Sequence, residues 1–246
     1  MLKRVEVHVT YKCDLGCLYC NRGCFSHIEF APDMSLEYFT RFIDECKSLN
    51  FPVKEFVIIG GEPTLHKDCI EFIKVAKNYT DSIGGSVILF SNNYSNRAHS
   101  IIEYVKSNNL CIVYEPTFKT KKVNHAESPD DFCVFISPTD IGKKRIDPCG
   151  CYIYCGFSMD SLGYTSCSLG GTISSLLCPE VRTRNLKDLM DEEFIEWQLS
   201  KLCKHCGVLL CKRSDVSPDM LHTFCGTQMT KTWYNAFKIH NENQMI

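Results

Sequence analysis

The chain has 246 residues, of which 44% are hydrophobic and 23% are charged, with a formal net charge of −2. This is the balance of a globular protein with enough apolar residues for a core, and it excludes a bulk electrostatic attraction to nucleic acid or to an anionic membrane. No run of 18 apolar residues occurs, and the first residues alternate as a strand does rather than as a signal peptide does, so we expect a cytoplasmic protein with no membrane span.

The predicted elements alternate between apolar strands and amphipathic helices. We expect strands over 4–10, 56–59, 86–90, 110–114 and 132–136, and helices after the capping residue Ser35, over 67–79 and over 97–108. This alternation predicts an α/β fold built from parallel β/α units. Because it stops after about five strands, a complete eightfold barrel is excluded.

The composition changes near residue 147. The following segment predicts a hairpin with its turn at 160–163 and cysteines on both arms, and then a helix over 185–203. We therefore divide the chain into a first region, 1–147, and a small cysteine-rich region, 148–246.

Seventeen cysteines are too many for an ordinary cytoplasmic core, and metal ligation explains them better than disulfides do. Cys46, Cys69, Cys111 and Cys133 lie within helix or strand patterns, so we expect them to be small buried hydrophobic residues. Most of the others lie near the N-terminus or in the last hundred residues.

Two motifs carry specific chemistry. Cys13, Cys17 and Cys20 have the spacing C-x3-C-x2-C, and three such thiolates can bind three irons of a [4Fe–4S] cube, which leaves the fourth iron open. The strand at 56–59 runs into Gly60-Gly61-Glu62-Pro63-Thr64, where the glycines allow close approach of a ligand, the glutamate can pair with an ammonium group and the proline stiffens the turn.

Together these motifs resemble the radical SAM superfamily. The resemblance implies a shortened partial barrel of five or six β/α units, with the site at the carboxyl ends of the strands. It implies that the open iron chelates S-adenosylmethionine. It assigns six residues to that cofactor: Tyr19, Gly60, Gly61, Glu62, Pro63 and Asn92. For Tyr19 ordinary loop packing stays an alternative, and for Asn92 a plain turn role does.

The later cysteines resemble the SPASM/twitch extensions that carry auxiliary [4Fe–4S] clusters. The candidate ligands of one or two such clusters are Cys149, Cys155, Cys167, Cys203, Cys206, Cys211 and Cys225. A single twitch-like cluster would use Cys149 or Cys151 together with Cys167, Cys203 and Cys206. The roles of Cys151 and Cys178 stay open, as does that of Asp215, which stands where the fuller pattern has a cysteine. Zinc is the alternative, as a ribbon here or as a knuckle completed by Cys24 in the first motif.

The resemblance implies an oxidoreductase or maturase that reductively cleaves S-adenosylmethionine, with the resulting 5′-deoxyadenosyl radical taking a hydrogen atom from a small molecule or peptide. Auxiliary clusters would help to oxidise or crosslink that substrate, as in anaerobic sulfatase-maturating enzymes, aminoglycoside-pathway dehydrogenases and enzymes that crosslink ribosomal peptides. An external donor such as flavodoxin or ferredoxin would supply electrons. No acid/base pair is needed for the first step, and we assign none. The alternatives are a glycyl-radical-enzyme activase and a non-catalytic iron–sulfur or zinc protein.

Overall fold

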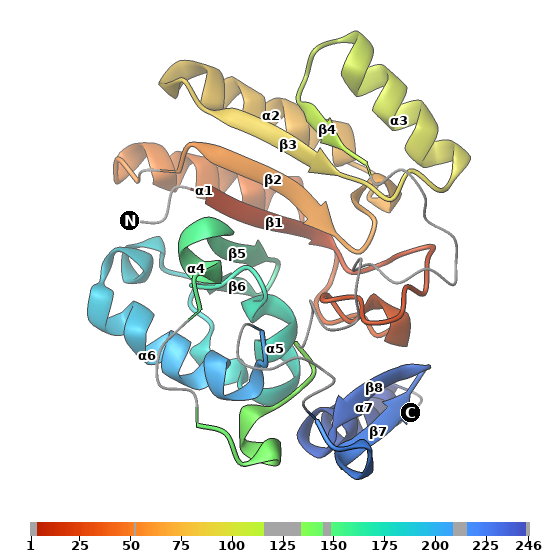
Figure 1. Cartoon of the computed structure of the whole chain (residues 1–246). Coiled ribbons are helices and arrows are strands. Elements are labelled where there is room, and N and C mark those ends of the chain that lie inside the picture. The colour runs from red at the N-terminus through yellow and green to blue at the C-terminus, as the bar shows by residue number, and fades with distance from the viewer. Residues whose placement is uncertain (1–3, 52, 116–133, 145–148, 209–215, 245–246) are drawn as a thin grey trace.

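A six-stranded sheet organises the chain, in the order β4-β3-β2-β1-β5-β6 (Figure 1). The computed structural model describes residues 4–51, 53–115, 134–144, 149–208 and 216–244. The strands are β1 (Arg4–Thr10), β2 (Glu55–Gly60), β3 (Ser86–Phe90), β4 (Ile112–Tyr114), β5 (Phe157–Asp160) and β6 (Gly163–Thr165). All neighbouring pairs are parallel except β5 and β6, which form an antiparallel hairpin.

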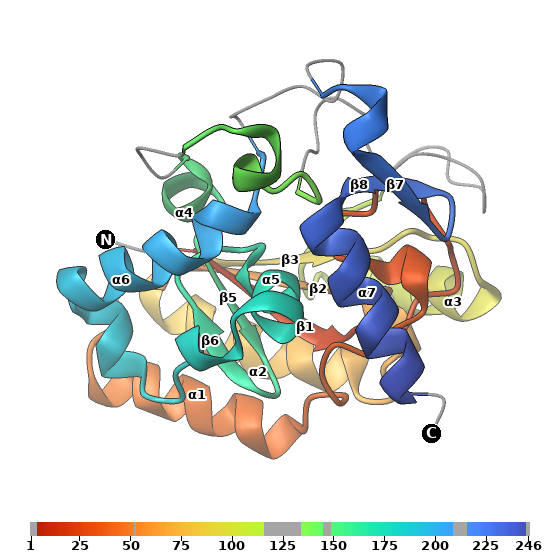
Figure 2. The same ribbon diagram turned by 90° about the horizontal axis from the view of Figure 1, so that it is seen from below.

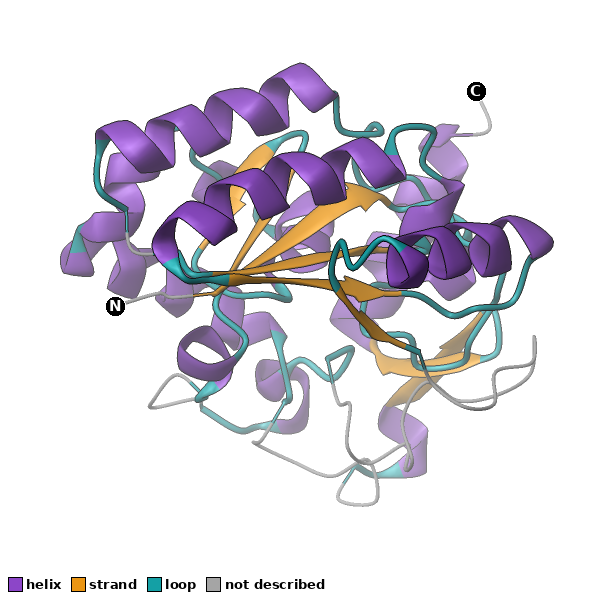
Figure 3. Cartoon of the chain, turned by 90° about the horizontal axis from the view of Figure 1, so that it is seen from above, coloured by secondary structure: helices purple, strands orange, loops and turns teal. Residues whose placement is uncertain are grey.

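Three helices cover one face of this sheet, namely α1 (Leu36–Ser48), α2 (Cys69–Ile83) and α3 (Asn96–Ser107) (Figure 3). Ser35 caps α1 as predicted, since its hydroxyl accepts a hydrogen bond from the backbone N–H of Tyr38 at 3.1 Å. Val5, Val7 and Val9 of β1 are fully buried in the core beneath these helices. The other face of β1 therefore carries its polar residues.

The opposite face of the sheet is covered by α5 (Gly170–Leu177), α6 (Glu192–Leu202) and α7 (Lys231–Gln244) (Figure 2). A short helix, α4 (Cys151–Tyr154), precedes β5, and a separate hairpin joins β7 (Leu221–Phe224) to β8 (Thr227–Thr230). The remaining helical turns are η1 (Cys24–Ser26), η2 (Pro63–Leu65), η4 (Pro138–Ile141), η5 (Pro179–Val181), η6 (Leu186–Met190), η7 (Cys203–His205) and η9 (Pro218–Met220). None of the helices in the described ranges is long and apolar enough to cross a membrane.

The α/β class with a mostly parallel sheet is confirmed, as are the first four strands, the first three helices and the β5–β6 hairpin. The helix expected over 185–203 is broken: it begins as η6 and restarts as α6, whose first N–H groups are capped by the Asp191 carboxylate. Cys46 and Cys69 are buried and Cys111 is partly buried, as expected, while Cys133 lies outside the described residues. Closure into a partial barrel stays a prediction.

The fifth strand was predicted at the wrong place. Of the run 132–136, residues 134–136 are described, and they form a turn and irregular chain rather than a strand. Val134, Phe135 and Ile136 are fully buried, and a short apolar run buried on all sides cannot be told from a strand by its pattern. The fifth strand is β5, which pairs parallel with β1 in the register Val5 to Phe157. The hairpin of the cysteine-rich region thus extends the sheet of the first region.

Candidate functional site

The carboxyl ends of β1, β2 and β3 meet at one edge of the sheet and bring the predicted motifs together. The N–H of Gly61 donates to the carbonyl of Thr10 at 2.8 Å, and the N–H of Glu62 donates to the carbonyl of Lys12 at 2.8 Å. The N–H of Asn92 in turn donates to the Glu62 carboxylate at 2.6 Å. These bonds fix the turn after β2 against the loop after β1 and the loop after β3.

The two glycines are required by the approach of one chain segment to another. Gly60 has a φ of 149°, and a Cβ there would lie 2.0 Å from the carbonyl oxygen of Thr10. A Cβ on Gly61 would lie 2.3 Å from the carbonyl oxygen of Lys12. The structure therefore gives the glycines a first role in strand packing, and their predicted role toward a ligand stays a prediction. Pro63 is buried at the start of η2.

The Glu62 carboxylate is fully buried and joins β2 to β3. Its Oε1 accepts from the N–H and the hydroxyl of Thr64 at 3.1 and 2.6 Å and from the Ser91 hydroxyl at 2.9 Å, while Oε2 accepts from Asn92. Burial raises the pKa of Glu62, although the hydrogen bonds from Thr64, Asn92 and Ser91 oppose the rise. Since Oε2 accepts a single one of these bonds, it keeps a lone pair for an ammonium donor.

The loop after β1 carries the three cysteines of the first motif. The side-chain amide of Asn92 donates to Asp14 at 2.7 Å and lies 3.8 Å from the Cys13 sulfur. The N–H of Cys20 donates to the carbonyl of Cys17 at 3.3 Å, which turns the loop back on itself. Burial raises the pKa of Cys13 to about 12, and the negative charge of Cys20 adds to the effect.

Tyr19 has a φ of 59°, a left-handed conformation that is uncommon outside glycine. Its N–H donates to the Thr227 hydroxyl at 3.3 Å, so the cysteine loop contacts β8. A Cβ on Gly226 would lie 2.9 Å from Leu18, which places the β7–β8 turn against the same loop. Cys225, in that turn, is exposed.

Cys24, the residue that would complete a zinc knuckle, is a buried thiol. Its hydrogen bond to the Cys20 sulfur lowers the pKa of Cys20 to about 6, and Arg22 contributes to the same shift, while the pKa of Cys24 is raised well above its usual value. Within the described ranges, no three His, Cys, Asp or Glu side chains are arranged to hold a single metal ion. Cysteine thiolates are the usual protein ligands of iron–sulfur clusters.

A second group of cysteines gathers from separate elements, at the amino end of β5 and around η7. The pKa of the buried Cys167 is raised well above its usual value, first by burial and then by the negative charges of Cys206, Cys149 and Cys203. Hydrogen bonds between sulfurs link Cys151 to Cys149 and to Cys155; they raise the pKa of Cys151 and lower that of Cys155 to about 6. The structure thus brings six thiols into one neighbourhood: Cys149, Cys151, Cys155, Cys167, Cys203 and Cys206.

The other candidate ligands are placed differently. Cys178 is 2% exposed, and apart from burial the charges that act on its pKa belong to Glu180, Lys204, Arg182 and Lys201. Cys211 and Asp215 lie outside the described residues.

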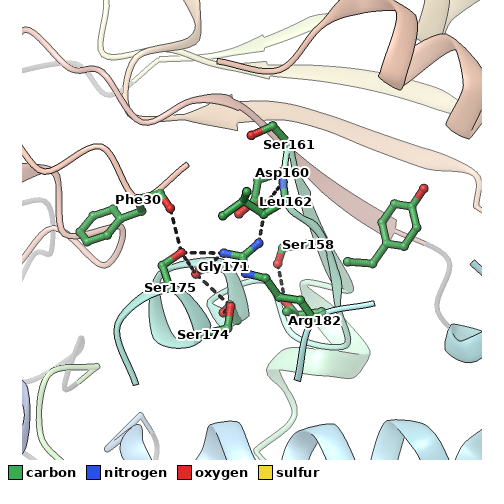
Figure 4. A network of polar contacts seen from close by, with 12 residues as sticks. Phe30, Ser158, Asp160, Ser161, Leu162, Gly171, Ser174, Ser175 and Arg182 are labelled. Carbon is green, nitrogen blue, oxygen red and sulfur yellow. Dashed lines mark hydrogen bonds and ion pairs between the residues drawn. The ribbon is translucent and has the colours of Figure 1, made fainter. Parts of the chain in front are cut away.

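A buried polar network joins the loop after β1 to the hairpin and α5 (Figure 4). Arg182 forms an ion pair with Asp160 and also donates to the carbonyl of Gly171 at 2.8 Å and to the Ser175 hydroxyl at 2.7 Å. Asp160 accepts a further bond from the hydroxyl of Tyr11 at 3.0 Å. The sequence does not reveal this network because its members are up to 171 residues apart and follow no motif.

A second set of buried polar residues lies on the face of β1 opposite the valines. Arg22 forms an ion pair with Glu6, and the two side chains are each 7% exposed. Nε2 of His8 lies 4.0 Å from the Glu6 carboxylate, and burial, together with the charges of Arg22 and Arg182, lowers the pKa of His8 well below its usual value. Burial therefore favours the neutral form of His8. The alternation of residues 4–10 could have predicted an inward polar face on β1, but not its partner.

Comparisons with known proteins point to one family. A model of the radical SAM superfamily matches residues 7–114. An S-adenosylmethionine-dependent nucleotide dehydratase from Selenomonas ruminantium is 33% identical over 31% of this chain and 26% of its own length. A probable GTP 3′,8-cyclase from Methanopyrus kandleri is 29% identical over 32% of this chain and 25% of its own length. The chain thus spans about a quarter of the length of these curated relatives.

The fold extends the likeness beyond the matched segment. The crystal structure of BtrN in complex with AdoMet and 2-DOIA superposes with a TM-score of 0.50 over 84% of this chain and 93% of that one, at 14% identity. At that identity the likeness concerns the fold. The matched segment contains the three motif cysteines, the glycine turn and Asn92. Residues 7–114 of this chain therefore form a radical SAM domain, and the enzymes to which the chain is similar support an enzyme.

Proposed function

We propose that the chain is a radical SAM oxidoreductase or maturase that reductively cleaves S-adenosylmethionine and abstracts a hydrogen atom from its substrate. One observation carries the proposal: Asn92 contacts both the Glu62 carboxylate and the Cys13 sulfur, so three strand ends that are far apart in the sequence form one site. Such a junction at the carboxyl edge of parallel strands is where ligands bind in open α/β folds.

The residues of this site fit the cofactor that the family uses. Cys13, Cys17 and Cys20 would hold three irons of a [4Fe–4S] cluster, and the turn 60–63 with the spare lone pair of Glu62 would hold the methionine end of S-adenosylmethionine. Tyr19 and Asn92 would contact the adenine and the ribose. When bound, the cluster and S-adenosylmethionine supply a 5′-deoxyadenosyl radical. The protein holds the substrate beside it and excludes water.

The second cysteine group supports at least one auxiliary [4Fe–4S] cluster. Cys167 and Cys206 are 7% and 5% exposed, and the negative charges of Cys206, Cys149 and Cys203 help to raise the pKa of Cys167. Gathering so many thiols in a buried place is unfavourable for thiolates unless a metal compensates their charge. The proposed ligands are Cys167, Cys203, Cys206 and either Cys149 or Cys151, and Cys155, Cys211 and Cys225 are the remaining candidate ligands. This assigns residues 148–246 to a SPASM/twitch-like role.

A small molecule is the proposed substrate, with a peptide as the alternative. The named relatives act on nucleotides, and BtrN, which shares the fold, is described with AdoMet and the small molecule 2-DOIA. An external donor such as flavodoxin or ferredoxin would supply the electron. We keep a cytoplasmic location, without nucleic acid or membrane partners, as part of the proposal.

The test is anaerobic reconstitution of the full chain, followed by iron analysis and by reaction with dithionite and S-adenosylmethionine. We expect about eight irons per chain if one auxiliary cluster accompanies the first, and formation of 5′-deoxyadenosine. A count of about four irons with active cleavage would remove the auxiliary cluster from the proposal. Absence of 5′-deoxyadenosine in a fully loaded protein would refute the reaction itself and favour a non-catalytic iron–sulfur protein.

A further inference from the structure

The two cysteine groups lie at opposite ends of β1. The loop with Cys13 to Cys20 follows its carboxyl end (Figure 1). β5 runs parallel to β1 and pairs Phe157 with Val5, so Cys155 lies at the amino end. β6 returns antiparallel and pairs Thr165 with Ser158, which brings Cys167 to that same end. A side chain on the polar face of β1, opposite the valines, therefore lies between the two cysteine groups.

Arg22 occupies this intermediate position. It follows the first cysteine motif in the sequence, but its side chain turns back along β1 and forms an ion pair with Glu6. Its backbone carbonyl accepts a hydrogen bond from the Thr172 hydroxyl at 3.2 Å, which ties it to α5 on the side of the second region. The charges of Cys20 and Cys167 both act on Arg22, so it is within electrostatic reach of one cysteine from each group.

The guanidinium of Arg22 is incompletely satisfied by the protein. Nη2 faces the Glu6 carboxylate, but Nε and Nη1 are buried and have no hydrogen-bond partner in the part of the chain that the structure describes. Buried donors of this kind are normally paired, and a buried charge is costly without compensation. An anion at one or both cysteine groups would meet this requirement. A thiolate-bound iron–sulfur cluster is such an anion, and hydrogen bonds and nearby charge set its reduction potential.

We propose that Arg22, held by Glu6, is a positioning cation between the two iron–sulfur sites that raises the reduction potential of the clusters bound at Cys20 and Cys167. This inference rests on the proposed function. The step that it influences is the transfer of one electron from a reduced external donor to a bound cluster. The donor is oxidised by one electron, the cluster gains one negative charge, and no bond or proton moves. A fixed positive charge nearby stabilises the product of that step more than the reactant.

The sign of the shift tests the proposal. Arg22→Gln removes the positive charge, so we expect the equilibrium constant for one-electron reduction to fall at least tenfold, which is a shift of about 59 mV to lower potential. Glu6→Gln removes the opposing negative charge and should shift the potential upward. The double variant should fall between the two. Arg41→Gln is the matched control, because Arg41 is an exposed arginine on α1 that packs over the Tyr38 ring.

The readout is the midpoint potential of each cluster, from redox titration followed by electron paramagnetic resonance, with iron counted in every sample. If the wild-type protein binds only the first cluster, the auxiliary part of the proposed function fails, while the Cys20 cluster still tests Arg22. Full iron content with unchanged potentials in Arg22→Gln overturns the inference. If Arg22→Gln does not load iron, Glu6→Gln decides: an upward shift supports the inference, and an unchanged or lower potential overturns it.

Discussion

The two cysteine groups of this protein are assembled in different ways. The first lies within eight consecutive residues, and backbone hydrogen bonds from Gly61 and Glu62 to the chain after β1 hold its loop at the strand ends. The second draws its thiols from α4 and its flanking residues, from the segment after β6 and from η7 and the residue after it, and its members are up to 57 residues apart. A local motif therefore identifies the first site, and long-range packing builds the second.

Two side chains fix the second group. Gln198 of α6 is fully buried; it accepts from the N–H of Ser166 at 2.8 Å and donates to the carbonyl of Val181 at 2.5 Å, which holds the segment that leads to Cys167. The indole N–H of Trp233 donates to the carbonyl of His205 at 2.7 Å and so anchors η7. The second site thus depends on the fold of the whole region, whereas the first depends mainly on β1 to β3.

The largest expected effect comes from removing the first site. In Cys13→Ala/Cys17→Ala/Cys20→Ala we expect 5′-deoxyadenosine formation to be lost, because no ligands remain for the cluster, and iron to fall by about four per chain. Product analysis and iron analysis after anaerobic reconstitution measure both. Unchanged cleavage in this variant would contradict the assignment of the first site.

Removal of the second cysteine group should separate binding of the auxiliary cluster from cleavage of S-adenosylmethionine. Cys167→Ala/Cys206→Ala should lose about four irons yet still form 5′-deoxyadenosine with dithionite, since the ligands of the first site are intact. Cys46→Ala, which changes a buried thiol on the core-facing side of α1, is the control and should keep all the iron. Equal iron in both variants would show that the second group does not bind a cluster.

The junction between the two regions should be strongly sensitive to Asp160→Asn. Breaking a buried ion pair leaves the other charge uncompensated, and the Arg182 side chain is 8% exposed, so we expect a loss of about 4 kcal/mol in the free energy of unfolding. Urea denaturation of the full chain measures it. A loss below about 1 kcal/mol would show that the ion pair between Arg182 and Asp160, drawn in Figure 4, contributes little to stability.

Gly60→Ala tests the packing of the strand ends. The added methyl would lie 2.0 Å from the Thr10 carbonyl oxygen at a positive φ, so we expect a loss of about 3 kcal/mol. Gly84→Ala is the matched control, because Gly84 also has a positive φ but no atom within 4 Å of the added Cβ. Its loss should be about 1 kcal/mol. Equal losses in urea denaturation would remove the steric part of the explanation.

Ser35→Ala should have the smallest effect. It removes the side-chain acceptor that caps α1, which costs about 1 kcal/mol in the free energy of unfolding. Ser35→Asp keeps an acceptor at this position and should restore the stability in the same assay. A loss in Ser35→Ala that Ser35→Asp does not restore would contradict the capping role.

Some strands of this protein could be predicted from local sequence patterns, and others could not. The strands at 4–10 and 86–90 were predicted with their observed bounds, because alternating or continuous apolar residues indicate which side chains of a strand are buried. The strand predicted at 132–136 was wrong, because the buried residues 134–136 lie in a turn and irregular chain. No local sequence pattern predicts the pairing of β5 with β1 or the ion pair between Arg22 and Glu6.

The amino-acid sequence by itself determined the α/β class, the three-thiolate motif and the glycine turn that follows β2. Each of these depends on residues close together in the chain, where spacing and backbone geometry constrain the chemistry directly. The tertiary structure alone decided which distant thiols become neighbours, and that the buried Arg22 pairs with Glu6. These contacts depend on packing and burial across the whole fold, and a short segment of the sequence does not determine them.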